Sequence, residues 1–243
     1  MWSLSAAAPA GGRTWPNRVV PDGCIDILFD LRRGAASVIG PMTRAICYRV
    51  TGPLDLVGIR FRPGGAAPLL DPEAAELRDL APGVRETVPR WRRVLELAER
   101  LPALAPDARR RVALEAVARW LDGARPGDAA VIEAARVARV SRGRATVGDL
   151  AGATDLTRRT LERRFRTAVG LTPKFALRVE RFREAGRLLD LGTAASLSGV
   201  AFRAGYADQP HMTREITELA GVTPARWAAE RVAFVQDGSA ARP

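Results

Sequence analysis

The chain has 243 residues, of which 47% are hydrophobic, and a formal net charge of +11. This length allows one large domain or two of ordinary size, and the charge favours an acidic polymer as partner, nucleic acid before membrane. Two cysteines, Cys24 and Cys47, are too few for a disulfide scaffold and leave no CxxC pair for zinc. No apolar run approaches the roughly 20 residues that span a bilayer, and Met1–Gly12 makes a poor signal peptide. We therefore expect a soluble, intracellular protein.

The sequence pattern of the N-terminal part of the chain predicts a small β-rich region. Residues 1–17 are rich in Ala, Gly and Pro, and we expect a flexible tail there. Short apolar runs then alternate with turn signals as far as Pro63-Gly64-Gly65. The runs cover residues 25–29, 36–39, 45–50 and 54–61. This alternation predicts a small antiparallel sheet or part of a barrel.

From residue 66 onward the apolar spacing becomes helical. The spacing predicts a short helix at 73–80, amphipathic helices at 89–101 and 107–121, and a further helix at 128–140. Ser141 to Arg144 is the expected domain boundary. We expect an α+β fold in which a sensor or dimerisation domain with sheet and helices (18–140) precedes an all-α domain (141–236) and a flexible tail (237–243).

The last hundred residues contain the same helix-turn-helix pattern twice. Leu161, Arg163, Phe165, Gly170 and Pro173 recur 51 residues later as Met212, Arg214, Ile216, Gly221 and Pro224. The helices have polar N-caps and glycine stops. The expected caps are Thr146, Thr157, Thr172 and Asp208, and the stops are Gly170, Gly192 and Gly205. A domain with two such helices can read two neighbouring stretches of major groove.

Residues 146–235 resemble the C-terminal DNA-binding region of the AraC/XylS family of bacterial transcription regulators. The string GYADQPHMTR at 205–214, followed by GVTP at 221–224, resembles the most specific signature of that family. LERRF at 161–165, with GLTP at 170–173, resembles its counterpart in the first unit. The resemblance implies two helix-turn-helix units joined by a long helix, with double-stranded DNA as partner. RNA polymerase, a small-molecule effector and a second copy of the chain are further expected partners.

Each recognition helix must bury one face and present the other to base edges. Leu161 and Phe165 are expected to point inward in the first unit, and Met212 and Ile216 in the second. By analogy with the family, the expected base contacts are Arg159, Glu162, Arg163, Gln209, Thr213 and Arg214. Arg158, Arg164 and Arg166 are expected to contact phosphates, and the alternative for these three is a solvated helix face.

Several positions depart from the family pattern or allow two interpretations. Asp155 stands where glycine is usual, but Asp tolerates the left-handed region. Ile216 replaces a usual phenylalanine, and Glu215 adds a negative charge beside Arg214, so we expect a weakened or retuned second unit. Arg181 is expected to form a structural ion pair, and the alternative is a DNA contact. His211, the single histidine, is expected to pack or to contact phosphate.

Two N-terminal strings, PDGCID at 21–26 and GIRFRPGG at 58–65, resemble an uncharacterised domain often attached to this kind of DNA-binding region. One interpretation is a small-molecule sensor with Cys24, Asp26 and Arg60 near its pocket. The alternative places Asp22-Gly23 in a turn, buries Cys24 as a small side chain, and pairs Arg60 with Asp26 or Asp55.

The sequence thus predicts a DNA-binding transcription regulator whose activity an effector modulates through the N-terminal domain. The alternative is a thiol-dependent enzyme in which Cys24 is the nucleophile and the DNA-binding region targets the enzyme to DNA. No Gly-rich phosphate loop and no metal-ligand spacing support that alternative. We therefore expect no catalysis, cofactor or metal, and a cytoplasmic protein associated with the nucleoid.

Overall fold

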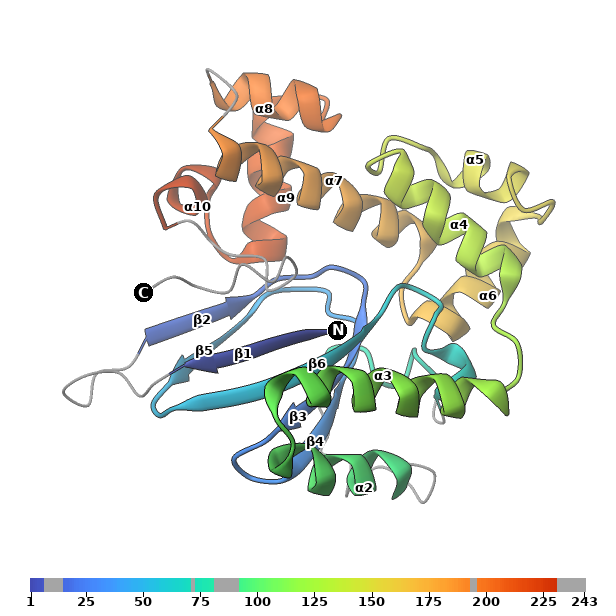
Figure 1. Cartoon of the computed structure of the whole chain (residues 1–243). Coiled ribbons are helices and arrows are strands. Elements are labelled where there is room, and N and C mark those ends of the chain that lie inside the picture. The colour runs from blue at the N-terminus through green and yellow to red at the C-terminus, as the bar shows by residue number, and fades with distance from the viewer. Residues whose placement is uncertain (7–14, 71–72, 81–91, 193–195, 231–243) are drawn as a thin grey trace.

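The computed structural model describes residues 1–6, 15–70, 73–80, 92–192 and 196–230. It has an α+β fold in which strands come first along the chain and helices follow (Figure 1). The strands are β1 (Trp2–Ala6), β2 (Trp15–Val19), β3 (Ile25–Asp30), β4 (Ala35–Ile39), β5 (Ile46–Val50) and β6 (Leu54–Phe61). They form one antiparallel sheet in the order β1-β6-β3-β4 and a second that pairs β2 with β5. The fold class and the strands at the four apolar runs are confirmed.

Strands β1 and β2 correct the prediction of a flexible tail at residues 1–17. β1 pairs with β6, from Trp2 opposite Gly58 to Ala6 opposite Leu54, and β2 pairs with β5. A Cβ at Gly58 would lie 2.1 Å from Cε2 of Trp2, so this glycine makes room for the indole. The hydrogen-bond partners of both strands lie far along the chain, and the local composition of residues 1–17 carries no sign of them. Residues 7–14 lie outside the described part.

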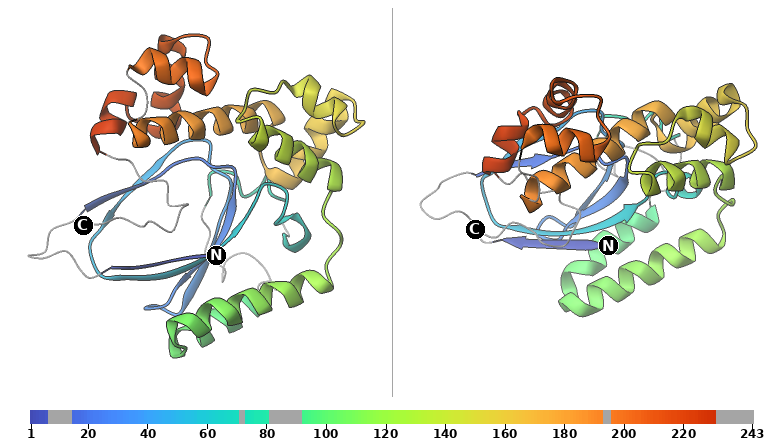
Figure 2. Two further views of the ribbon diagram at one scale, coloured as in Figure 1. Left: turned by 45° about the horizontal axis from the view of Figure 1, so that its top comes forward. Right: turned by 90° about the horizontal axis from the view of Figure 1, so that it is seen from above.

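Two helices cover one face of the larger sheet (Figures 1 and 2). They are α2 (Arg92–Arg100) and α3 (Pro106–Asp122), joined by the 3-10 turn η4 (Leu101–Ala103). Their apolar residues share one core with the sheet, which includes Ile27, Phe29, Val38, Ile59, Leu97, Leu101 and Ala113. The helix predicted at 107–121 is confirmed. The helix predicted at 89–101 is confirmed from Arg92, and its first three residues lie outside the described part.

The short helix predicted at 73–80 is wrong, because the segment forms successive turns. Part of its backbone is hydrogen-bonded to the loop that follows β4. The N–H of Gly40 donates to the carbonyl of Leu80, and the N–H of Asp79 donates to the carbonyl of Pro41. Asp79 adopts a φ of 59°, which also ends any helical path. Contacts with a distant loop therefore replace the i to i−4 pattern that the local spacing favoured.

The C-terminal helices begin and end where the sequence predicted. They are α5 (Val147–Gly152), α6 (Arg158–Val169), α7 (Pro173–Leu191), α8 (Leu197–Ala204), α9 (Gln209–Ala220) and α10 (Pro224–Glu230). The side chains of Thr146, Thr157, Thr172 and Asp208 accept hydrogen bonds from backbone N–H groups as N-caps, and Gly170, Gly192 and Gly205 have positive φ. Asp155 adopts the left-handed region at φ 52°, as expected for the first turn.

Helix α4 (Ala129–Val140), predicted at 128–140 and assigned from sequence to the N-terminal domain, packs instead with the C-terminal helices. Val131, Ala134 and Ala138 are buried in the same core as Leu161 and Phe165 of α6. The apolar stripe of α4 therefore belongs to the first helix-turn-helix unit. Among the described helices, none is long and apolar enough to cross a membrane.

Candidate nucleic-acid interface

Helix α7 separates two helical units of the same design. Its 19 residues correspond to a length of roughly 28 Å. α5 and α6 pack near its N-terminal end, and α8, α9 and α10 pack near its C-terminal end (Figures 1 and 2). The first unit shares a core with α4, and the second has its own core around Phe182, Met212, Ile216 and Trp227. The structure thus presents two recognition helices, α6 and α9, at the two ends of one rigid spacer.

Helix α6 buries its apolar face and exposes its basic face. Leu161 and Phe165 are fully buried, as the i and i+4 spacing predicted. The exposed side chains include those of Arg158, Arg159, Glu162, Arg163 and Arg166. All three base-contact candidates of the first unit therefore lie on the solvent face. Their contact with DNA remains a prediction.

Arg164 is the exception among the basic residues of α6. Its guanidinium donates two hydrogen bonds of 2.6 Å to the carboxylate of Asp128, the N-cap of α4. Partial burial pushes the pKa of Asp128 upward, but the hydrogen bonds from Arg164 outweigh this and hold the pKa below its ordinary value. Arg164 therefore ties α6 to α4, and the phosphate contact predicted for it would require this ion pair to break.

Helix α9 has the same two-faced arrangement. Met212 and Ile216 are fully buried, so isoleucine fills the position where the family usually has phenylalanine. Gln209 and Arg214 are exposed, and Thr213 is half-buried. The three base-contact candidates of the second unit therefore border the solvent side of the helix near its N-terminus and middle.

Glu215 does not lie beside Arg214 on the solvent face, which corrects the sequence interpretation. Its side chain is 6% exposed and faces α7, where it accepts a hydrogen bond of 2.9 Å from Nε of Arg178. Nη2 of Arg181 lies 3.6 Å from its second oxygen, so the structural ion pair predicted for Arg181 is confirmed. Consecutive helical residues point about 100° apart, which carries Glu215 inward and leaves Arg214 outside.

His211 packs at the edge of the same cluster. Its ring meets that of Tyr206 edge-on, with 5.3 Å between centroids, and its Nε2 lies 4.0 Å from Glu215. Burial, reinforced by the negative charge of Glu215, raises the pKa of the Tyr206 hydroxyl. The predicted packing role of His211 is thus present in the geometry.

The N-terminal domain contacts the C-terminal ends of both recognition helices. Arg18 donates a hydrogen bond of 2.7 Å to the carbonyl of Ala220, and the N–H of Ala45 donates one of 2.7 Å to the carbonyl of Leu219. At the end of α6, a Cβ on Gly170 would lie 2.5 Å from the carbonyl oxygen of Ala74. Sequence reasoning missed these contacts, because nothing local marks Arg18 or Ala45 as a partner of a helix end.

Of the three effector candidates, Arg60 and Asp26 form a buried ion pair. Nη2 of Arg60 lies 2.6 Å from Asp26, and Nη1 lies 2.9 Å from Asp22, so the structural alternative for Arg60 is present. Cys24 and Arg60 line one cavity of about 630 Å³, which also contacts α4 and α7. Burial, followed by the charge of Asp22, raises the pKa of the Cys24 thiol. A raised thiol pKa lowers the fraction of thiolate, which is the nucleophilic form of cysteine.

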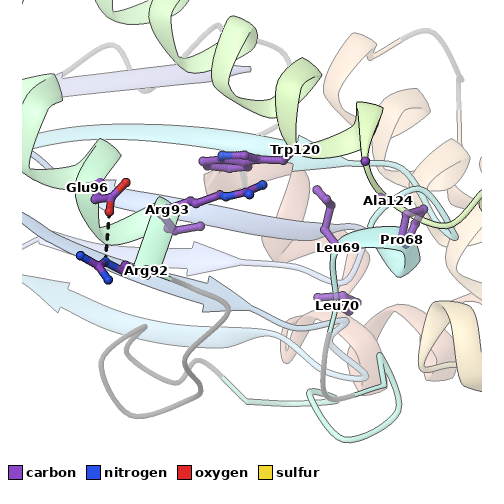
Figure 3. A pocket seen from close by; sticks show the side chains of 10 residues that line it. Pro68, Leu69, Leu70, Arg92, Arg93, Glu96, Trp120 and Ala124 are labelled. Atoms are coloured by element: carbon purple, nitrogen blue, oxygen red, sulfur yellow. Dashed lines mark ion pairs between the residues drawn. The ribbon is translucent and has the colours of Figure 1, made fainter.

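A second cavity of about 630 Å³ lies between the 3-10 turn η2 (Ala67–Leu69), α2 and α3 (Figure 3). Trp120 and Leu69 contribute apolar walls, and Arg92 pairs with Glu96 at 3.2 Å. None of the site residues predicted from sequence lines this cavity. In the described ranges, no group of three or more His, Cys, Asp or Glu side chains is arranged to hold a metal ion.

Comparison with known proteins agrees with this geometry. Residues 150–230 match a family model described as a helix-turn-helix domain, of the AraC type, and residues 1–81 match a domain of unknown function. No curated protein matches the chain.

Among solved structures, the DNA-binding domain of AdpA in complex with a target DNA is 28% identical, with a TM-score of 0.39, over 42% of this chain and 93% of that one. The xylose-binding transcription activator xylR is 24% identical, with a TM-score of 0.38, over 42% of this chain and only 27% of its own length. Apo ToxT from Vibrio cholerae is 10% identical, with a TM-score of 0.47, over 93% of this chain and 96% of that one. Residues 150–230 therefore form a helix-turn-helix domain of the AraC type.

Proposed function

We propose that the protein reads one specific DNA sequence by inserting α6 and α9 into successive major-groove segments on one face of the duplex. The observation that carries this proposal is the placement of two solvent-facing recognition helices at the two ends of α7. The spacer is roughly 28 Å long, comparable with the approximately 34 Å between major-groove segments one helical turn apart. One rigid domain can therefore span both segments.

The exposed side chains suit direct readout of base edges. Arg159 and Arg163 on α6 and Arg214 on α9 can each bind guanine O6 and N7 with two hydrogen bonds. Gln209 can bind adenine in the same two-pronged way, Thr213 can contact a thymine methyl, and Glu162 can accept a hydrogen bond from cytosine N4. Arg158 and Arg166 are left to neutralise phosphates beside α6.

The N-terminal domain is proposed to control this binding through an effector. It holds the C-terminal end of α9 through Arg18 and Ala45 and abuts the end of α6 at Gly170. A shift of this domain would move both recognition helices at once. An effector that prefers one arrangement would change the population that is competent to bind DNA. The proposal assigns no catalytic step to Cys24, because partial burial raises the pKa of its thiol and disfavours the thiolate.

The test is selection of genomic DNA fragments by the purified protein, followed by titration of salt and of variants on the enriched sequence. We expect one motif with two half-sites about one helical turn apart. Arg163→Ala should relax preference at one base position and cost about 1–3 kcal/mol of discrimination. Arg166→Gln should weaken binding to all sequences alike and lower the salt slope by about one.

Arg110→Gln is the matched control, since Arg110 is an exposed arginine of α3, away from both recognition helices. It should leave affinity and salt slope unchanged. Failure to enrich any sequence above background would refute sequence-specific binding. Equal effects of the Arg163 and Arg166 changes on all sequences would instead refute the assigned readout roles.

A further inference from the structure

The cavity that contains Cys24 and Arg60 lies between the two domains. Met1, Trp2 and the end of β6 line it from the N-terminal side, and α4 and α7 line it from the side of the helix-turn-helix domain. Its volume of about 630 Å³ falls within the roughly 300–1,000 Å³ typical of small-molecule sites. Anything bound there would touch both domains.

The charged residues of this cavity are five arginines and one glutamate. Three of the arginines have carboxylate partners at 2.6 to 3.4 Å. The pairs are Arg60 with Asp22 and Asp26, Arg136 with Glu133, and Arg183 with Glu180. The single lining glutamate is thus already engaged by an arginine of its own helix.

The remaining two arginines, Arg62 and Arg139, form no ion pair with any residue in the described ranges. Arg62 follows β6, and Arg139 belongs to α4, so each domain contributes one of these positive charges. Both side chains are exposed, and a guanidinium group presents several N–H donors to an anion. The cavity therefore has two guanidinium groups with no described carboxylate at ion-pair distance, and the charge of Arg139 acts on Glu180 only from farther away.

The rest of the wall is largely apolar. Trp2 and Pro63 contribute from the N-terminal side, and Ile132 and Ala135 from α4. The indole Nε1–H of Trp2 is buried and has no acceptor among the described residues. An unpaired buried donor is unfavourable, so an acceptor atom on a ligand would stabilise this arrangement. Ile132 is 44% exposed, and a ligand body lying on it would remove apolar surface from water.

We infer that this interdomain cavity binds a small organic anion whose acidic group pairs with Arg62 and Arg139 and whose apolar body lies against Trp2 and Ile132. The acidic group is a carboxylate or a phosphate, since guanidinium groups bind both. Such a ligand would bridge the β6 end of the sheet and α4. The regulatory consequence, a change in DNA affinity, rests on the proposed function; the binding site itself does not.

The experiment measures binding of four probes to the full chain by calorimetry and thermal unfolding. The probes are benzoate, phenyl phosphate, the neutral amide benzamide and inorganic phosphate. They are compared on the wild type, the double variant Arg62→Gln/Arg139→Gln and the control variant Arg110→Gln. We expect benzoate, phenyl phosphate or both to bind and to raise the unfolding temperature. The double variant should bind the same probe about tenfold more weakly or worse, and the control variant should match the wild type.

A preference for benzoate over phenyl phosphate, or the reverse, identifies the acidic group. The inference is overturned if neither organic anion binds at millimolar concentrations, if benzamide binds as well as benzoate, or if the double variant binds like the wild type. Inorganic phosphate that binds as tightly as phenyl phosphate would overturn the role of the apolar wall. The same probes are then added to the DNA-binding assay. Binding without any change in DNA affinity supports the site and refutes its role as the effector site.

Discussion

Gly170 and Gly192 form a natural matched pair for testing the contact between the domains. Both are helix stops with positive φ, 79° at Gly170 and 58° at Gly192. A Cβ at Gly170 would lie 2.5 Å from the carbonyl oxygen of Ala74 and 2.6 Å from Cγ of Pro41. A Cβ at Gly192 would meet no atom of the described residues within 4 Å. Alanine therefore introduces backbone strain at both positions and a steric clash at Gly170 alone.

The expected magnitudes follow from these two terms. The left-handed conformation costs an L-residue about 1–2 kcal/mol, so Gly192→Ala should lower the free energy of unfolding by that amount. Overpacking against a fixed backbone adds about 1–3 kcal/mol, which brings Gly170→Ala to about 2–5 kcal/mol. Ala74 and Pro41 belong to the N-terminal domain, so the additional loss at Gly170 measures how closely that domain abuts the end of α6.

The assay is urea unfolding of both variants beside the wild type, followed by circular dichroism, with DNA affinity measured on the enriched fragment. Gly170→Ala should lose more stability than Gly192→Ala. It should also change DNA affinity, because the clash displaces the N-terminal domain from α6. Equal losses in the two variants would refute the close approach of Ala74 and Pro41. An unchanged DNA affinity in a destabilised Gly170→Ala protein would refute the coupling of this contact to DNA binding.

The other predictions concern buried charges and thiols. Asp128→Asn keeps an N-cap on α4 but removes the ion pair to Arg164, so it should cost up to about 1 kcal/mol of unfolding free energy at pH 7. Since the folded-state pKa of Asp128 is lowered, this difference from the wild type should begin to shrink below about pH 4, the unfolded-state pKa, and should be lost as the pH falls through the lower folded-state pKa in acid urea titrations; a difference that stays unchanged down to about pH 2 would refute the assignment. Glu215→Gln should lower the free energy of unfolding by about 2–4 kcal/mol, because it removes the buried negative charge of α9 that pairs with two arginines of α7. A variant as stable as the wild type in urea would contradict this. Thiol labelling at pH 7.5 with peptide mapping should modify exposed Cys47 and spare Cys24, and equal labelling would revive Cys24 as a reactive residue.

Features set by neighbours three or four residues away could be predicted from the sequence. The N-caps at Thr157 and Asp208 bond backbone groups of their own first helical turn, so residue type and spacing suffice to place them. The inward turn of Leu161 and Phe165 follows from helical periodicity alone. For the same reason, the exposed faces of α6 and α9, and with them the candidate base contacts, could be predicted before the fold was known.

Features set by partners far along the chain required the tertiary structure. β1 exists because β6 supplies its hydrogen bonds, and Arg164 is paired with α4 because Asp128 caps that helix 36 residues earlier. In the sequence, Glu215 stands next to Arg214 and looks like a surface charge. In the structure it is buried, because Arg178 of α7, 37 residues away, pairs with it. The cavity between the domains likewise forms only where β6 meets α4. A charged side chain pairs with the group that the folded backbone brings within about 3 Å. The spacing of residues along the sequence does not show which group that is.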